Sequence, residues 1–149
     1  MKFFENVNAG DTSTSPEYLI TREEIIEMAT KWDPQPIHID EEHSKNGFFG
    51  DIIACTAHLF SILSRLNHQI PDDEKIKLVA GLGFGEGKIH RPVLPDTKLH
   101  MVMEITEARP SNSNPGWGII STDHKLYTQD GDLAFSMTST AIAEKKSAE

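Results

Sequence analysis

The sequence has a single cysteine, Cys55, and no long apolar segment. One cysteine cannot form an intrachain disulfide and is too few for a cysteine-rich zinc site. No uninterrupted apolar run approaches the roughly 18 residues that a membrane-spanning helix needs. The N-terminus MKFFENVNAGDT is not a signal peptide, since the acidic Glu5 follows Phe3 and Phe4 directly. We therefore expect a cytoplasmic protein that does not enter the membrane.

Positive charge is also scarce. Lys and Arg number 14 against 23 Asp and Glu, which gives a formal net charge of −9. Such a chain repels phosphate backbones, so we expect no nucleic-acid partner. The length of 149 residues fits one domain, and a hydrophobic content of 38% is enough for one core. We predict a single domain over 1–149, with an extended polar arm at about 1–16 and a charged tail at 144–149 that frays.

The first third of the chain predicts a short strand followed by a helix. Tyr18-Leu19-Ile20 is typical of a strand, and Thr21 with Glu24 three residues later is a capping-box pattern that starts a helix. The helix should end near Trp32, because two of the next residues precede prolines and are pushed out of the α region. The segment 33–40, DPQPIHID, is therefore predicted to be a stiff, extended loop.

A nearly all-apolar segment follows a polar connector at 41–51. It runs from Ile52 to Leu66, IIACTAHLFSILSRL, and carries one obligatory charge, Arg65. A helix of this kind must be surrounded by protein. The rest of the chain changes to the alternation of strands, which we predict at 76–90, 97–106, 117–127 and 133–143. One buried helix and a run of antiparallel strands indicate the α+β class, with the sheet curled around the helix.

Asp33 and His38 are the candidates for acid–base chemistry. They lie five residues apart in a loop stiffened by two prolines, which could hold both side chains around one water. The same pair could also be only a structural cap. His38, Asp40 and His43 match the spacing of a metal site only in outline, and we expect no metal.

The segment DPQPIHID resembles the D-x-N-P-x-H-x-D loop of the MaoC-like dehydratases, the (R)-specific enoyl-CoA hydratases of the hot-dog fold. The stretch RPVLPDT at 91–97 is similar to the family's R-P-V-x-x-G-D-T turn, and QDGD at 129–132 matches its last hairpin. The resemblance covers nearly the whole chain and implies a curled antiparallel sheet around one long central helix. Two positions depart from it: Gln35 replaces Asn, and Ala54-Cys55 replaces His-Gly.

By this resemblance, Asp33 and His38 share the proton transfers of the reaction. The backbone N–H of Cys55, at the start of the central helix, is the expected donor to the developing oxyanion. Cys55 could instead be a nucleophile or a small packing residue. Ser61 corresponds to a family serine with a supporting hydrogen bond, although a serine in an apolar helix often bonds only its own turn.

The resemblance implies a hydro-lyase of fatty acid metabolism. It would add water to trans-2-enoyl-CoA, or dehydrate (R)-3-hydroxyacyl-CoA, on a CoA or acyl-carrier thioester without a cofactor. Lys88 and Arg91 could meet CoA phosphates, or could simply be solvated. Two alternatives stay open: a hot-dog thioesterase, and a non-catalytic acyl-CoA-binding subunit, which Ala54-Cys55 alone supports. We expect a homodimer, because a curled sheet leaves edge strands unpaired and hot-dog proteins join two sheets edge to edge.

Overall fold

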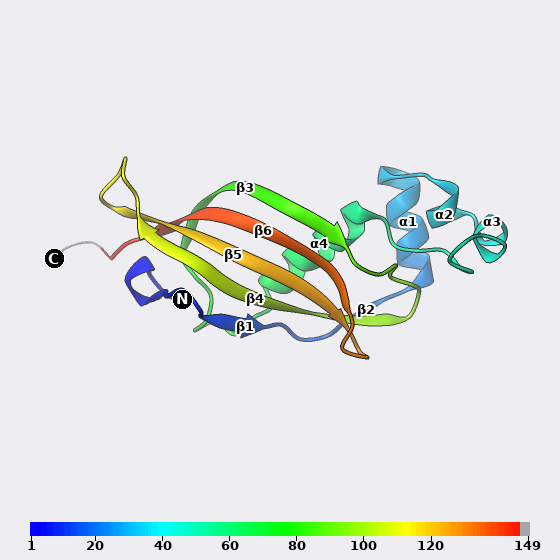
Figure 1. Cartoon of the computed structure of the whole chain (residues 1–149), viewed down its shortest axis with the longest axis horizontal. Coiled ribbons are helices and arrows are strands. Elements are labelled where there is room, and N and C mark those ends of the chain that lie inside the picture. Colours follow the sequence, from blue (N-terminus) through cyan, green and yellow to red (C-terminus); the bar gives the residue numbers. More distant parts are fainter. Residues whose placement is uncertain (147–149) are drawn as a thin grey trace.

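An antiparallel six-stranded sheet curls over one long helix in the computed structural model of the chain, which describes residues 1–146 (Figure 1). The strands are β1 (Thr12–Thr14), β2 (Tyr18–Ile20), β3 (Leu78–Ile89), β4 (Thr97–Pro110), β5 (Trp117–Thr128) and β6 (Leu133–Glu144). Their order is β1-β4-β5-β6-β3, and β2 also pairs with β4. The α+β class and the antiparallel sheet predicted from the sequence are confirmed.

The central helix α4 (Thr56–Asn67) supplies one side of the core. Its buried apolar side chains, Leu59, Ile62, Leu63 and Leu66, belong to one cluster with the inward-facing residues of β4, β5 and β6. The predicted start at Ile52 is wrong. The N–H of Ile53 donates to the carbonyl of Ile37 and that of Ala54 to Val93, so this backbone is bound to other segments and stays outside the helix.

Helix α1 (Arg22–Trp32) has the predicted boundaries. The Thr21 hydroxyl accepts a hydrogen bond from the Glu24 N–H at 3.2 Å, which is the first half of the predicted capping box. The helix ends before Asp33, whose backbone has left the α region, as expected for a residue that precedes proline.

Two short helices lie where an extended loop and a connector were predicted. Gln35 is extended, but Pro36 begins α2 (Pro36–Ile39), because the fixed φ of proline suits the first position of a helix. Asp40 then caps α3 (Glu41–Lys45) by accepting from the N–H of His43 at 2.9 Å. The segment 33–45 is therefore more tightly folded than the sequence pattern indicated.

The two ends of the chain are bound to the sheet. The predicted arm at 1–16 contains η1 (Phe4–Asn6) and β1, which pairs with β4. Glu144 ends β6, and the Lys145 N–H donates to the carbonyl of Gly116, so these residues are not frayed as predicted. The rest of that predicted tail, 147–149, lies outside the described residues.

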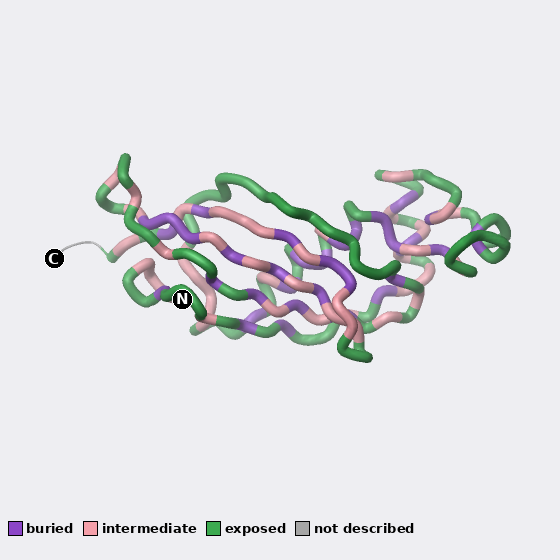
Figure 2. Tube along the Cα trace, viewed as in Figure 1, coloured by how far each residue is buried: buried purple, intermediate pink, exposed green. Residues whose placement is uncertain are grey.

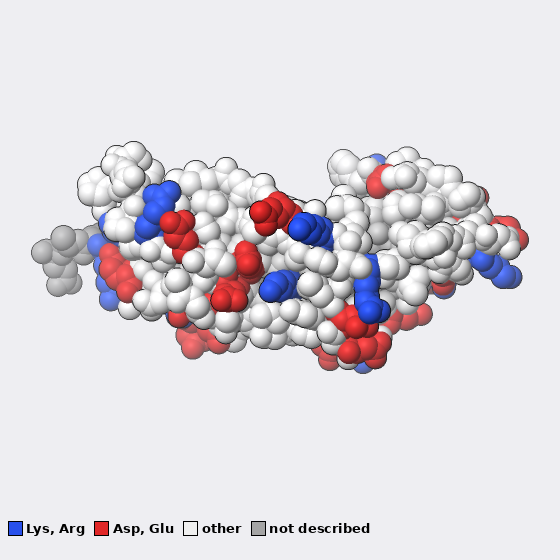
Figure 3. Space-filling model, viewed as in Figure 1, with Lys and Arg blue, Asp and Glu red and all other residues white. Residues whose placement is uncertain are grey.

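Strand β3 is an open edge of the sheet, and all twelve of its residues are exposed (Figure 2). It carries five exposed large apolar side chains: Leu78, Val79, Leu82, Phe84 and Ile89. On the face drawn in Figure 3, acidic and basic side chains are interspersed and form no continuous basic area. Within residues 1–146, no helix is long and apolar enough to span a membrane.

Candidate functional site

Asp33 lies at the C-terminal end of α1 with its side chain about one-third exposed. One carboxylate oxygen, Oδ1, accepts a hydrogen bond from the Gln35 side-chain amide at 2.8 Å. The other, Oδ2, faces the ring of His38, with 3.6 Å between Oδ2 and Nε2. The structure thus brings together the two residues that the sequence predicted as a pair, and Gln35 orients the carboxylate.

His38 is held in α2 with only 5% of its surface exposed. Its Nδ1 lies 2.6 Å from the carbonyl oxygen of Ile53. A carbonyl oxygen can only accept, so Nδ1 must carry a proton and, in the neutral ring, Nε2 has a free lone pair. The bond to Ile53 therefore selects the tautomer that presents a basic nitrogen to Asp33.

Asp33 and His38 place two hydrogen-bond acceptors close together. In the neutral-ring state, Nε2 and Oδ2 are both acceptors, and 3.6 Å is too long for a direct hydrogen bond. A water placed beside the pair can donate one hydrogen to each acceptor. The arrangement of the two acceptors allows one water to bridge them.

Cys55 is the N-cap of α4 and is 1% exposed. In the part of the chain that the structure describes, its backbone N–H has no hydrogen-bond acceptor. This N–H lies at the positive end of the helix dipole, two residues after the carbonyl that binds His38. A free N–H in that position is suited to bind a carbonyl oxygen that gains negative charge.

The loop that carries these groups is tied to α1 by an ion pair. The Arg22 guanidinium binds both oxygens of Asp51, at 2.7 and 2.8 Å. This bidentate hydrogen bonding holds the pKa of Asp51 below its usual value. The pair fixes the segment just before Cys55 against the helix that ends at Asp33.

The other residues predicted for the site lie apart from the pair. Ser61 donates to the Ala57 carbonyl one turn earlier, at 2.8 Å, which is the ordinary bond of a serine within a helix. Lys88 is exposed on β3, and Arg91 pairs with Asp132 at 3.3 Å. Within residues 1–146, no group of three or more His, Cys, Asp or Glu side chains is arranged to hold a metal ion.

The family of the chain follows from comparison with known proteins. The family model described as "MaoC like domain" matches residues 3–124. The chain belongs to the MaoC-like family. It is 27% identical over 112 residues to the uncharacterized protein YdeM of Bacillus subtilis (strain 168), an alignment that covers 74% of this chain and 76% of that protein.

Two solved structures place the MaoC-like chain in its fold. The MaoC-like dehydratase from Rhodospirillum rubrum superposes with a TM-score of 0.89 at 25% identity, covering 99% of this chain and 100% of that one. The unliganded R-hydratase PhaJ1 from Pseudomonas aeruginosa gives a TM-score of 0.75 at 18% identity, covering 99% and 92%. The predicted hot-dog fold is confirmed.

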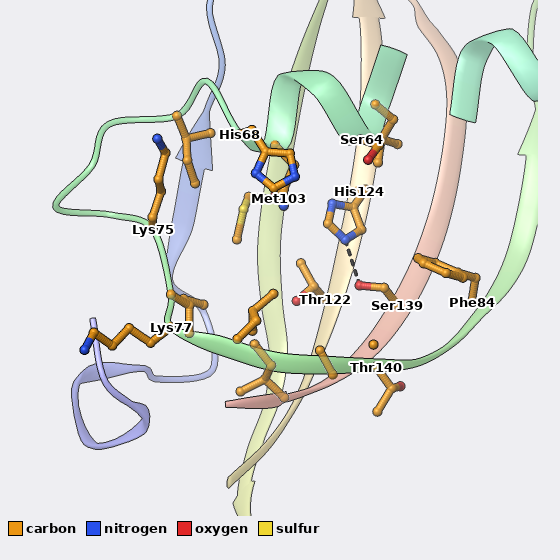
Figure 4. A pocket seen from close by; sticks show the side chains of 18 of the residues that line it. Ser64, His68, Lys75, Lys77, Phe84, Met103, Thr122, His124, Ser139 and Thr140 are labelled. Carbon is orange, nitrogen blue, oxygen red and sulfur yellow. Dashed lines mark hydrogen bonds between the residues drawn. The ribbon is translucent and has the colours of Figure 1, made fainter. Parts of the chain in front are cut away.

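A cavity of about 510 Å³ lies between α4, β3 and the inner face of the sheet of this MaoC-like protein (Figure 4). Its lining is mainly apolar and includes Phe60, Leu63, Phe84, Met103 and Ile120. The first of these follows Cys55 by five residues, which is about 7.5 Å along a helix axis. The cavity therefore begins more than one helical turn beyond the start of α4.

The cavity wall also contains a buried histidine that the sequence reasoning missed. His124 on β5 is 6% exposed, and its Nε2 lies 2.9 Å from the Ser139 hydroxyl. Its Nδ1 has no partner among the described residues. Burial lowers the pKa of His124 to about 4, against a smaller opposing effect of Asp123. Only the inward position in the alternation of the strand signalled this residue in the sequence.

A second, smaller cavity of about 440 Å³ lies on the other side of α4, between that helix and α1. There His58, 3% exposed, places Nε2 at 3.4 Å from a carboxylate oxygen of Glu24, which also accepts a hydrogen bond from the Tyr18 hydroxyl. Burial and the Glu24 carboxylate raise the pKa of Tyr18 to about 12. Sequence reasoning missed this cluster too, since its members come from three separate elements.

The low pKa of His124 predicts an acid-sensitive fold. In the unfolded chain, the His124 ring has a pKa near 6.5 and binds a proton below that pH. In the folded chain, its pKa is about 4, so it binds a proton only at lower pH. This contribution to stability is therefore complete above pH 6.5 and is lost as the pH falls toward 4, by roughly 3 kcal/mol. The measurement is the free energy of unfolding in urea at several pH values for wild type and His124→Leu. We expect the difference between the two curves to change steadily over this window.

His90→Ala is the control, because His90 is an exposed histidine that directly follows the edge strand β3. Its stability curve should run parallel to that of wild type. Parallel curves for His124→Leu as well would contradict the assigned low pKa.

Proposed function

We propose that the chain is a hydro-lyase that adds water to the double bond of a trans-2-enoyl thioester, or removes it from an (R)-3-hydroxyacyl thioester. The observation that carries this proposal is the Asp33–His38 pair, in which a basic ring nitrogen and a carboxylate oxygen face each other at 3.6 Å. The match to the MaoC-like family and the likeness to a dehydratase from Rhodospirillum rubrum support it.

The proposed reaction begins with a water that donates to Nε2 of His38 and Oδ2 of Asp33. Its oxygen attacks C3 of the enoyl group while the pair takes one of its protons. The electron pair of the double bond moves toward the thioester carbonyl, and the proton returns from the pair to C2 on the same face. Water is added in full, the pair regains its starting state, and no redox cofactor or metal enters the scheme.

The oxygen of the thioester carries negative charge while the enolate exists. The free N–H of Cys55 is our candidate donor to this oxygen, assisted by the positive end of α4. We place the thioester at the start of α4 and the far end of its acyl chain in the cavity of about 510 Å³, whose lining on that helix begins at Phe60. The carrier of the thioester is CoA or an acyl carrier protein.

Loss of either member of the pair should remove most of the activity. We expect Asp33→Asn and His38→Asn each to lower kcat on trans-2-butenoyl-CoA by about 10²–10⁴-fold. Asparagine at 38 removes the basic nitrogen and keeps an amide N–H for the Ile53 carbonyl. His38 is buried, so His38→Ala would also leave a cavity, and asparagine is the better test of the chemistry. The assay follows loss of the enone absorbance.

His43→Ala is the matched control, since His43 is an exposed histidine on α3. It should keep wild-type activity. Release of free thiol without loss of the double bond would show a thioesterase instead, and neither signal from any enoyl thioester would show a non-catalytic binder. A kcat above a third of wild type in either pair variant would remove that residue from the mechanism.

Cys55 distinguishes a backbone donor from a thiol nucleophile. If its N–H is the donor, Cys55→Ser should stay close to wild type, and Cys55→Gly should keep or raise activity by easing approach of the carbonyl. Both variants should fold, because Cys55 is an N-cap, where serine and glycine are tolerated better than in a helix interior. Complete inactivity of a folded Cys55→Ser, with iodoacetamide inactivation that substrate prevents, would favour the nucleophile.

We further propose that two copies join through β3. A twelve-residue edge with exposed apolar side chains is the kind of strand that another chain pairs with. We expect light scattering to give twice the 16.6 kDa of one chain. Leu82→Glu should shift the protein to monomer, because it places charge on the joining edge. Leu19→Glu, at an equally apolar exposed position on β2, should leave the dimer intact. A monomeric wild type at micromolar concentration would contradict the proposal.

A further inference from the structure

The wall of the larger cavity contains a polar group of residues where the core should be apolar. Thr122 and His124 point inward from β5, between the buried Ile120 and Leu126. Ser139 is the direct cross-strand partner of Thr122. Polar side chains on an inward face cost stability unless each finds a partner, so their placement side by side needs a reason.

His124 leaves one hydrogen-bonding position unused. Figure 4 shows its ring among Ser64, Thr122 and Ser139, with Nε2 directed at the Ser139 hydroxyl. The two nitrogens lie on opposite sides of the ring, so Nδ1 faces away from Ser139, and it has no partner in residues 1–146. A buried ring nitrogen without a partner lowers the stability of the fold, because it has lost its hydrogen bonds to water and gained none in return. A bound molecule in the cavity can supply the missing bond.

The charges around the cavity indicate an uncharged partner. Two lysines contribute to the lining, but the Lys75 ammonium pairs with Asp72 at 2.5 Å and the Lys77 ammonium lies 4.2 Å over the ring of Phe3. Glu144, also in the lining, adds a negative charge that would repel a carboxylate. An uncharged oxygen therefore suits this wall better than an acid group.

A hydroxyl satisfies either state of the histidine. If the Ser139 hydroxyl donates to Nε2, then Nδ1 carries the proton and donates to the oxygen of the ligand; if Nε2 donates, Nδ1 accepts from its O–H. A hydroxyl group can donate or accept the hydrogen bond, and the methyl end of a plain chain can do neither. The rest of the lining is apolar and suits a hydrocarbon chain.

We propose that His124, with Ser139 and Thr122, selects acyl thioesters whose chain carries a hydroxyl group near its far end. The inference rests on the proposed hydratase function and names its substrate class. A site built to bond a hydroxyl rejects the analogue that lacks it, because its own buried polar groups are then left unpaired. The residues that choose the substrate thus come from the sheet, whereas the proton-transfer pair comes from the loop after α1.

The test compares trans-2-enoyl-CoA substrates of increasing length with their ω-hydroxy counterparts. At the length that reaches His124, we expect wild type to prefer the hydroxylated chain at least tenfold in kcat/KM. His124→Leu should reverse this preference by weakening the hydroxylated chain and improving the plain one, whereas His124→Gln, which keeps a hydrogen-bonding amide, should retain part of it. Ser136→Ala is the control, because Ser136 forms a comparable bond with the exposed His90, and Ser136 is not among the residues that line the cavity.

A binding measurement separates this inference from the proposed reaction. Calorimetry of the Asp33→Asn variant with saturated acyl-CoA and ω-hydroxyacyl-CoA requires no turnover. If ω-hydroxyacyl-CoA binds more tightly than the plain chain but wild type hydrates no enoyl-CoA, the proposed reaction is overturned and the role of His124 is upheld. Hydration with no preference at any length, or with equal effects of His124→Leu on both series, would overturn the role of His124 alone. Stronger binding of an ω-carboxyl chain would overturn the selection of an uncharged group.

Discussion

The hydrogen bond from His38 to the carbonyl of Ile53 is the contact on which the rest of the site depends. It places the ring proton on Nδ1 and so leaves the lone pair of the neutral ring on Nε2. It also ties α2 to the segment that leads into α4, and the Ile53 N–H returns a bond to Ile37 in the same place. One short contact therefore sets both the chemistry of the histidine and the position of the helix start at Cys55. The core under α4 then fixes that start against the sheet.

Much of this arrangement could be predicted because it depends on neighbouring residues. Thr21 and Glu24 are three apart and form their cap locally, and a proline after Asp33 ends the helix wherever it occurs. The pairing of Asp33 with His38 also follows from a short loop. The apolar run wrongly extended α4 back to Ile52, whereas the family resemblance put its start at Cys55, which is the N-cap. The residue pattern alone could not find this start, since it depends on where the N–H groups of Ile53 and Ala54 find acceptors, and those lie in distant segments.

The buried histidines were outside the reach of sequence reasoning for a related reason. His58 is one polar residue in an apolar helix, and its partner Glu24 belongs to a different helix. His124 occupies an ordinary alternating position in β5, and it is buried because the sheet curls around it. In both cases one ring nitrogen is bonded or paired and the other is not. The sequence of residue types does not reveal an unpartnered ring nitrogen or a cavity beside it.

The separation of the loop from the sheet has a consequence for how such a protein diverges. The groups that we assign to the reaction, Asp33, His38 and the Cys55 N–H, lie before or at the start of α4. Thr122, His124 and Ser139 lie on strands far along the chain. With the roles proposed above, substitutions on β5 and β6 would change which acyl group is accepted and leave the acid–base geometry as it is. Two gene copies would then diverge in substrate through a few exchanges on these strands and keep the same reaction.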